Sequence, residues 1–267
     1  MPPSLYLNHL QVAYQGHIAL QVDSLQLPPA TICGLVGMNG AGKSTLFKAL
    51  MGFVRPQSGQ ILIYERPSGQ AQKQNLIAYM PQTEEVDWHF PVTVEEVVMM
   101  GRYGYLNFLR YPRPLDRALV QTSLEQVELW PLRQRQIGEL SGGQKKRTFL
   151  ARALAQIMTL EGKPRPSLLL LDEPFSGVDI RTEKMIIQRL LDLQSQGHTI
   201  LISTHNLDSV KTFCNQVILI NRTLLAYGET SEVFTPENLQ KAFSSGETFT
   251  SFPQPLLSLN REIMSWS

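Results

Sequence analysis

One eight-residue stretch has the residue types and spacing of a phosphate-binding loop. Residues 37–44 read Gly-Met-Asn-Gly-Ala-Gly-Lys-Ser, which fits G-x-x-x-x-G-K-[ST]. The glycines let the backbone turn tightly, so that successive N–H groups point at the β- and γ-phosphates of a nucleotide. Lys43 adds a positive charge, and the Ser44 hydroxyl can ligate Mg²⁺. The stretch predicts a nucleotide site made of Gly37, Met38, Asn39, Gly40, Ala41, Gly42, Lys43, Ser44 and Thr45.

The residues on either side of this loop have the patterns of a strand and a helix. Residues 31–36 are mostly apolar and predict a buried strand, and residues 45–51 predict the helix that follows. That order places the positive N-terminus of the helix against the phosphates.

A second segment could supply acids to the same site. Four leucines, 168–171, are followed by Asp172 and Glu173. A buried strand that ends in Asp172 would place this carboxylate beside the loop, where it can hold Mg²⁺ through water. Glu173 would then stand next to the γ-phosphate and could polarise the attacking water as a general base. The alternative is a strand that merely ends in a solvated acid pair, and the loop at 37–44 argues against it.

A third segment, residues 140–144, reads Leu-Ser-Gly-Gly-Gln. Gly142 and Gly143 expose backbone N–H groups at the start of a predicted helix over 144–156, and Ser141 adds a hydroxyl. The result is an anion site without a lysine of its own, although Ser-Gly-Gly alone is also an ordinary helix-capping turn. With this motif the chain resembles the ATP-binding cassette (ABC) family, whose signature is LSGGQ.

The resemblance covers about residues 4–243 and implies an α/β fold. It is that of a P-loop NTPase nucleotide-binding domain of the ABC type, with an antiparallel β edge and an inserted helical subdomain. In the family, two cassettes sandwich two ATP molecules, and the signature of one subunit caps the γ-phosphate that the other holds. The resemblance therefore implies an ATPase that uses ATP and Mg²⁺ and pairs with a second copy of itself, with Ser141, Gly142, Gly143 and Gln144 closing the site.

Four further positions match family motifs in the expected order. Gln82 resembles the Q-loop glutamine that touches Mg²⁺ and the attacking water, and Asp179 resembles the D-loop aspartate that crosses the dimer interface. His205 resembles the switch histidine that contacts the γ-phosphate. Tyr14 resembles the aromatic residue that stacks on adenine. The resemblance thus implies a catalytic set of Glu173, His205, Gln82 and Lys43, and Mg²⁺ ligands Ser44, Gln82 and Asp172.

The remaining elements follow from local patterns. Apolar and polar residues partly alternate in 5–14 and in 18–27, which predicts an antiparallel pair of strands. Residues 217–220 and 223–226 predict a hairpin. Short strands are expected at 61–64, 76–80 and 199–203, and a helix at 181–196. We expect an ATPase domain over 1–243, with the helical insertion at about 92–160. Residues 157–166 predict a surface loop away from the nucleotide, and the tail 244–267 has no assigned role.

Composition restricts the kinds of partner. The 267 residues are 43% hydrophobic and carry a net charge of +1, so nothing indicates a nucleic-acid partner. Cys33 and Cys214 stand beside apolar residues, and we expect buried thiols rather than a disulfide. No signal segment is recognisable, and no apolar run reaches the roughly 18 residues that cross a bilayer. We expect a peripheral protein on the cytoplasmic face of the inner membrane.

Two features bear on the kind of cassette. Residues 102–152 carry ten basic and four acidic side chains. The resemblance implies that this insertion docks on the permease at the membrane surface, where anionic lipid favours Lys and Arg. The alternative is a solvated helical face together with lysines close to the phosphates. Residues 84–91, 97–104 and 138–147 resemble ATPases of manganese and chelated-iron importers, and the acids within 84–91 predict an exposed loop rather than a metal site. The resemblance implies partners in a membrane permease and an extracytoplasmic metal-binding protein. Alternatives are a zinc, haem or siderophore importer, or a soluble cassette acting on DNA, ribosomes or cluster assembly.

Overall fold

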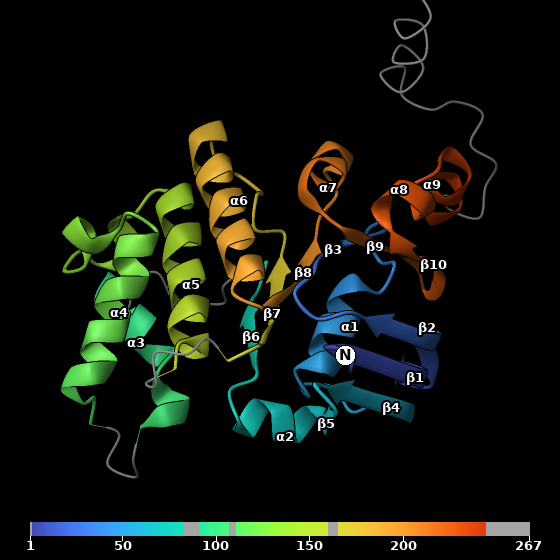
Figure 1. Cartoon of the computed structure of the whole chain (residues 1–267), viewed down its shortest axis with the longest axis horizontal. Helices are drawn as coiled ribbons and strands as arrows, with labels where there is room; N and C mark the ends of the chain where they lie inside the picture. Colours follow the sequence, from blue (N-terminus) through green and yellow to red (C-terminus); the bar gives the residue numbers. More distant parts are fainter. Residues whose placement is uncertain (1, 83–90, 107–110, 160–164, 244–267) are drawn as a thin grey trace, which may run out of the picture.

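In this computed structural model, which describes residues 2–82, 91–106, 111–159 and 165–243, ten strands form a single sheet. Their order is β5-β4-β1-β2-β10-β9-β3-β8-β7-β6, and the sheet runs through the whole molecule (Figure 1). The strands are β1 (Leu5–Tyr14), β2 (His17–Leu27), β3 (Ile32–Val36), β4 (Ser58–Ile63), β5 (Arg66–Pro67), β6 (Ile77–Met80), β7 (Leu168–Asp172), β8 (Thr199–Ser203), β9 (Gln216–Asn221) and β10 (Thr223–Glu229).

Strands β9, β3, β8, β7 and β6 form the parallel half of the sheet. Every residue of β3, β7 and β8 is buried, because helices or further strands cover both faces. Alternate residues enter different hydrophobic clusters: Leu169 and Leu171 face one, whereas Leu168 and Leu170 face the other. Burial on both faces explains why these strands read as continuous apolar runs.

The register brings the carboxyl ends of four parallel strands to one edge. Ser203, the last residue of β8, pairs with both Leu35 in β3 and Asp172 in β7. Met80, the last residue of β6, pairs with Leu171. The segments that follow these strands therefore emerge side by side, at the edge where open α/β sheets bind ligands.

The antiparallel half consists of the predicted pair, β1 with β2, extended by β4 and β5. The hairpin of β9 and β10 also forms as predicted. One connection was not expected: Thr223 of β10 pairs in parallel with Gln21 of β2, and this joins the two halves into one sheet. The antiparallel edge is therefore continuous with the parallel core.

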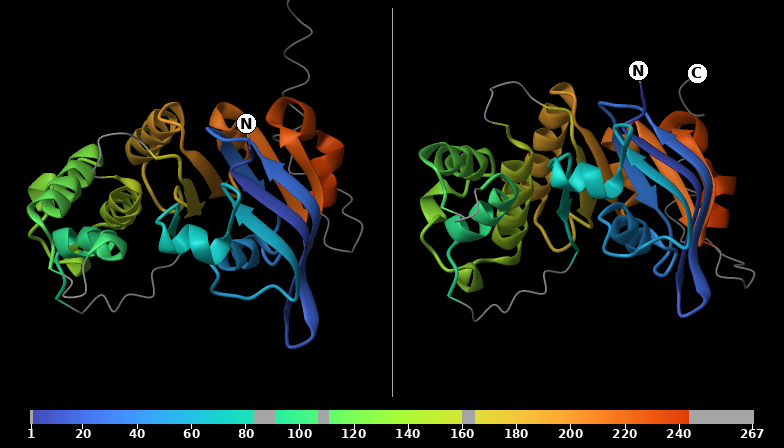
Figure 2. Two further views of the ribbon diagram at one scale, coloured as in Figure 1. Left: turned by 60° about the horizontal axis from the view of Figure 1, so that its bottom comes forward. Right: turned by 90° about the horizontal axis from the view of Figure 1, so that it is seen from below.

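Helices cover the two faces of the sheet (Figures 1 and 2). Buried side chains of α1 and α2 enter the cluster formed with the antiparallel strands. Buried side chains of α3 to α7 and α9 enter the cluster on the opposite face. The helices are α1 (Lys43–Leu50), α2 (Ser68–Lys73), α3 (Val94–Met100), α4 (Pro114–Gln126), α5 (Gly142–Ile157), α6 (Ile180–Ser195), α7 (Leu207–Phe213), α8 (Thr230–Val233) and α9 (Pro236–Phe243), with 3₁₀ turns at Tyr103–Tyr105, Trp130–Leu132 and Ile137–Glu139.

The section predicted to be helical contains α3, α4 and α5, which lie together beside the β6 edge of the sheet (Figure 1). A fully buried ion pair joins them: Arg102 donates to Asp116 at 3.2 Å and to the carbonyl oxygens of Ala155 and Met158 at 2.7 Å. Arg113 also pairs with Asp116, at 2.9 Å. The structure corrects the count of basic side chains here, because Arg102 contributes nothing to the surface charge.

Several other expectations concern the surface and the termini. No helix in the described ranges is long and apolar enough to span a membrane. Cys33 and Cys214 are both buried free thiols, as predicted, and burial raises the pKa of Cys214 to about 12. In the predicted surface loop, Arg165 donates to the Gln74 carbonyl oxygen, beside the amino ends of β6 and β7. Residues 84–90, 160–164 and the tail 244–267 lie outside the described residues.

Candidate functional site

The glycine-rich loop connects β3 to α1 at the carboxyl edge of the sheet. Gly42, the N-cap of α1, has φ of 99°, a left-handed value that favours glycine. A Cβ added to Gly37 would stand 2.3 Å from the carbonyl oxygen of Ile220, because the β9–β10 hairpin packs closely against the loop. Both glycines are therefore required by the local backbone, and the loop leads directly into the first turn of α1.

Lys43 is the buried cation of this loop. Its Nζ donates to the carbonyl oxygens of Gly37 at 2.7 Å and Met38 at 3.0 Å. Burial lowers the pKa of Lys43 below its ordinary value, while the carboxylates of Glu173 and Asp172 oppose that shift. The ammonium group is thus held by neutral carbonyls, and an anionic phosphate in the loop would offer it a stronger partner.

Asp172 closes β7 and is almost fully buried. Ser44 Oγ donates to its Oδ2 at 3.4 Å, and Ser203 Oγ donates to its Oδ1. The hydrogen bond from Ser203 sets the orientation of the carboxylate, because Ser203 lies directly beside Asp172 in the sheet. A serine hydroxyl and a carboxylate oxygen thus meet at the loop, and hard cations such as Mg²⁺ prefer such oxygen ligands.

Glu173 has a backbone conformation that is rare for a residue with a side chain. Its φ is 51°, and its N–H donates to the carbonyl oxygen and to the Oγ of Ser203, both at 3.1 Å. This backbone turns the carboxylate toward the end of β8, where His205 Nδ1 lies 2.8 Å from Glu173 Oε2. The Glu173 side chain is 8% exposed and that of His205 is 70% exposed. The pair therefore joins a buried acid to a solvent-facing imidazole.

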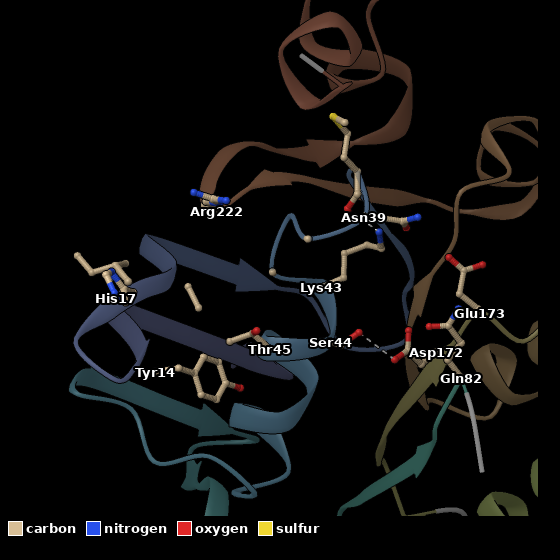
Figure 3. A pocket seen from close by; sticks show the side chains of 15 residues that line it. Tyr14, His17, Asn39, Lys43, Ser44, Thr45, Gln82, Asp172, Glu173 and Arg222 are labelled. Atoms are coloured by element: carbon tan, nitrogen blue, oxygen red, sulfur yellow. Dashed lines mark hydrogen bonds between the residues drawn. The ribbon is translucent and has the colours of Figure 1, made fainter. Parts of the chain in front are cut away.

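A cavity of about 620 Å³ lies in front of the loop (Figure 3), within the range of small-molecule sites. Within the loop, Gly37 and Ala41 are buried and do not line this cavity, and His205 contacts the cavity-lining Glu173. The cavity is lined by the predicted residues Tyr14, Met38, Asn39, Gly40, Gly42, Lys43, Ser44, Thr45, Gln82, Asp172 and Glu173, and also by His17, Ile18, Ala19 and Arg222.

The four additional lining residues come from two regions that the sequence did not connect to the loop. His17, Ile18 and Ala19 begin β2, and a two-residue turn separates them from Tyr14 at the end of β1. Arg222 lies in the turn between β9 and β10, and its N–H donates to the Ala41 carbonyl oxygen at 2.8 Å. The sequence predicts both hairpins, β1–β2 and β9–β10, from the patterns of their strands. Only the close packing of the hairpin on the loop reveals that Arg222 places a second cation on the cavity (Figure 3).

The signature segment lies outside this cavity. Ser141 is the N-cap of α5: its Oγ accepts from the N–H of Gln144 at 3.3 Å, and the Gln144 side chain accepts from the N–H of Ser141 at 2.9 Å. A Cβ on Gly143 would lie 3.9 Å from Asp179 Oδ2, so the signature and the D-loop are neighbours. The residues Ser141, Gly142, Gly143, Gln144 and Asp179 thus form a second group, apart from the cavity lining.

Asp179 begins α6 as its N-cap. Its carboxylate accepts from the N–H of Thr182 at 2.8 Å and from the Thr182 hydroxyl at 3.0 Å. The bond from the Thr182 N–H lowers the pKa of Asp179 below its usual range. The next residue, Ile180, is 72% exposed although it is a large apolar side chain. The D-loop therefore presents a fixed acid and an uncovered hydrophobic residue at the surface.

Comparisons with known proteins agree with these motifs. The sequence model described as "ABC transporter" matches residues 20–176, which is more than half of the chain. The chain belongs to the ABC transporter family. As a member it is an ATP-binding ATPase subunit of a transporter complex with membrane components, and the predicted fold class is confirmed.

Curated relatives and solved structures extend the match over most of the chain. It is 56% identical over 253 residues to "Manganese transport system ATP-binding protein MntA" of Synechocystis sp., covering 94% of this chain and 91% of that protein. It is 56% identical over 242 residues to "Chelated iron transport system membrane protein YfeB" of Yersinia pestis, covering 90% and 79%. The solved structure titled "An inward-facing conformation of a putative metal-chelate type ABC transporter" aligns with a TM-score of 0.75 at 32% identity, covering 91% of this chain and 89% of that chain.

Proposed function

We propose that this ATPase energises the import of a transition-metal ion, manganese first and iron second. The observation that carries the proposal is the 56% identity, over 94% of the chain, to the Synechocystis protein named for manganese transport. The Yersinia protein named for chelated iron is equally similar. The Treponema pallidum protein named for zinc transport, TroB, is 38% identical over 251 residues, which places zinc third.

The residues of the cavity have different roles in ATP hydrolysis. The loop N–H groups and Lys43 hold the phosphates, and Tyr14 stacks on adenine from the mouth of the cavity. Glu173 is the general base that takes a proton from the attacking water. His205, whose Nδ1 lies 2.8 Å from Glu173 Oε2, holds this carboxylate in its orientation and contacts the γ-phosphate. Gln82 orients the water from the end of β6.

The oxygen donors of the site fit Mg²⁺. Ser44 Oγ and Asp172 Oδ2 lie 3.4 Å apart, both are hard oxygen ligands, and the Gln82 side chain lines the same cavity. We assign the ion to Ser44, Gln82 and Asp172, the last through water. When bound, Mg²⁺ neutralises charge on the phosphate oxygens.

A second copy of the chain completes the site. The groups that would cap the γ-phosphate, Ser141 to Gln144, lie outside the cavity of their own chain, and the neighbouring Ile180 is largely exposed. A homodimer in which each signature closes the other chain's cavity would use both features. ATP binding closes the dimer, closure drives the transporter, and hydrolysis reopens it.

The permease is a separate membrane subunit, and an extracytoplasmic metal-binding protein delivers the ion to it. We place the chain on the cytoplasmic face of the inner membrane. Support comes from four large apolar side chains exposed around α3 and α4, namely Met100, Tyr103, Tyr111 and Leu115. Exposed apolar groups on neighbouring elements are typical of protein interaction sites.

Radioactive ion uptake tests the proposal. Cells that carry wild type, Glu173→Gln or the control Glu237→Gln are offered trace Mn²⁺, Fe²⁺ or Zn²⁺ separately. Glu237 is exposed on α9, so its substitution leaves the cavity untouched. We expect Glu173→Gln to abolish uptake of Mn²⁺, with a smaller loss for Fe²⁺.

If uptake of all three ions is the same in every strain, the metal assignment is wrong. In that case, release of the protein as a free species from cells that carry the permease would favour a soluble cassette. Its retention in detergent-extracted membranes would favour another cargo, such as haem or a siderophore complex.

A further inference from the structure

Two side chains of α5, one near each end of the helix, donate hydrogen bonds to the backbone of the sheet or of the segments that follow its strands. Near its C-terminus, Gln156 Nε2 donates to the carbonyl oxygen of Ile77, the first residue of β6, at 2.9 Å. Near its N-terminus, Lys146 Nζ donates to the carbonyl oxygens of Gln82 at 3.0 Å and Glu173 at 3.3 Å. Both side chains donate to backbone carbonyl oxygens, but Gln156 does so at the amino edge of the sheet and Lys146 at the nucleotide edge.

The contacts of Lys146 join three segments of the site. Lys146 lies one turn into α5, two residues after the end of the signature. Its two acceptors follow β6 and β7, and the side chains of both acceptor residues line the cavity. One ammonium group therefore connects the signature helix to the backbone of Gln82 and of Glu173.

The hydrogen bond from Lys146 to the Glu173 carbonyl oxygen is made to a residue whose backbone is in the left-handed region, with φ of 51°. A left-handed conformation is strained for a residue with a side chain, because its Cβ crowds the following carbonyl oxygen. Ser203 accepts from the Glu173 N–H, while the Glu173 carbonyl oxygen accepts from Lys146 and from the N–H of Ser176 at 3.2 Å. Among these contacts Lys146 supplies the charged donor, and hydrogen bonds from charged donors are about twice as strong as neutral ones.

We propose that Lys146 is a positioning residue: it holds the backbone of the general base Glu173, and of Gln82, in a fixed place relative to the signature helix. The inference rests on the proposed roles of Gln82 and Glu173. Its consequence is that the signature of one chain and the general base of that same chain move together, although they serve opposite sites of the dimer.

Substitution of these two α5 side chains gives a matched pair of variants. Lys146→Met and Gln156→Met each remove one side-chain donor from the same helix and leave an apolar chain of similar length. If Lys146 and Gln156 only hold α5 against the neighbouring segments, both variants lose thermal stability and turnover to the same small degree. If Lys146 positions Glu173, Lys146→Met lowers kcat about tenfold or more with KM for ATP changed less than about threefold, whereas Gln156→Met keeps kcat.

Steady-state ATP hydrolysis by the purified full chain gives kcat and KM for each variant, and its melting temperature is recorded alongside. Lys146→Arg keeps a charged donor, and we expect it to restore most of kcat; Glu173→Gln is assayed in parallel. If Glu173→Gln is inactive but Lys146→Met hydrolyses ATP like wild type or like Gln156→Met, the inference about Lys146 is overturned and the role of Glu173 stands. If Glu173→Gln retains wild-type turnover, the proposed mechanism itself is wrong.

Discussion

The cavity and the signature segment differ in how far one chain completes them. In the cavity, three charged groups are buried and already have partners: Lys43 with loop carbonyls, Asp172 with Ser44 and Ser203, and Glu173 with His205. The signature segment instead carries its groups at the surface, where Ser141 and Gly142 are exposed. Desolvated and mutually oriented charges indicate a prepared site, whereas exposed N–H groups at a helix start indicate a surface that awaits a ligand.

In the proposed homodimer, chemistry and closure belong to different chains. The cavity is lined by the residues that we assign to Mg²⁺ and to water activation and by most of the phosphate loop, and His205 contacts the cavity-lining Glu173. The signature adds an anion-binding helix start that cannot act on its own chain's cavity from its present position. One subunit would therefore bind ATP, but fast hydrolysis would need two.

The largest effect is expected for Glu173→Gln. Loss of the general base should lower turnover at least about 100-fold, because a positioned base contributes that much to proton transfer. ATP binding should remain, since Lys43 and the loop are intact, and the nucleotide-bound dimer should accumulate because hydrolysis no longer reopens it. Phosphate release and size-exclusion chromatography in ATP measure the two effects, with Glu237→Gln as the control. Turnover within a few-fold of wild type would remove Glu173 from the mechanism.

Mixing two inactive variants tests the separation of the two regions directly. Lys43→Ala damages the cavity and Ser141→Arg damages the signature, so each homodimer should be nearly inactive. In a heterodimer, the intact cavity of the Ser141→Arg chain meets the intact signature of the Lys43→Ala chain. Random pairing of two-fold dimers should restore about a quarter of wild-type turnover. Absence of recovery, with heterodimers verified by differently tagged chains, would mean that the signature acts within its own chain.

The sequence predicted the elements of both regions because their patterns are local. The continuous apolar run at 168–171 predicted a central strand, and the alternation in residues 5–14 predicted an antiparallel one; both are found. The helix predicted for 144–156 begins two residues earlier, because Ser141 caps it and Gly142 enters its first turn. The phosphate loop followed from spacing alone, since glycines and a lysine must stand at fixed intervals to surround a phosphate.

The contacts that assemble the regions could not be predicted, because they join residues far apart in the chain. Nothing near Arg102 indicates that it is buried against Asp116 rather than exposed with the other basic residues. The pairing of Thr223 with Gln21 and the bond from Lys146 to Glu173 likewise depend on the finished packing. The seven-residue helix α7 was missed because so short a segment carries little periodicity.

A smaller effect is expected for Arg222→Ala, at the rim of the cavity. Arg222 is exposed, so its guanidinium should contribute no more than a screened attraction to the nucleotide. KM for ATP should rise about threefold with kcat unchanged, and raised salt should reduce the difference between variant and wild type. Arg66→Ala, which removes an exposed arginine of β5, is the control and should leave KM unchanged. A loss of kcat instead would place Arg222 among the groups that act in the transition state.

The smallest effect on turnover is expected for His198, at the amino end of β8 and therefore far along the strand from His205. His198 is buried, and burial lowers its pKa to about 4. Because the unfolded chain binds this proton near pH 6.5, the folded state loses stability as the pH falls below that value, by about 2 kcal/mol between pH 7 and pH 5. His198→Phe removes this titration, so urea unfolding at the two pH values should differ less for the variant than for wild type.

At pH 7, where His198 is neutral in the folded chain, ATP hydrolysis by His198→Phe should equal that of wild type. Equal acid sensitivity of the two proteins would mean that His198 is not a source of acid instability. A drop in turnover at pH 7 without a drop in stability would couple the amino edge of the sheet to hydrolysis. The division argued above, with chemistry confined to the carboxyl edge and to a partner's signature, would then have to include the opposite edge.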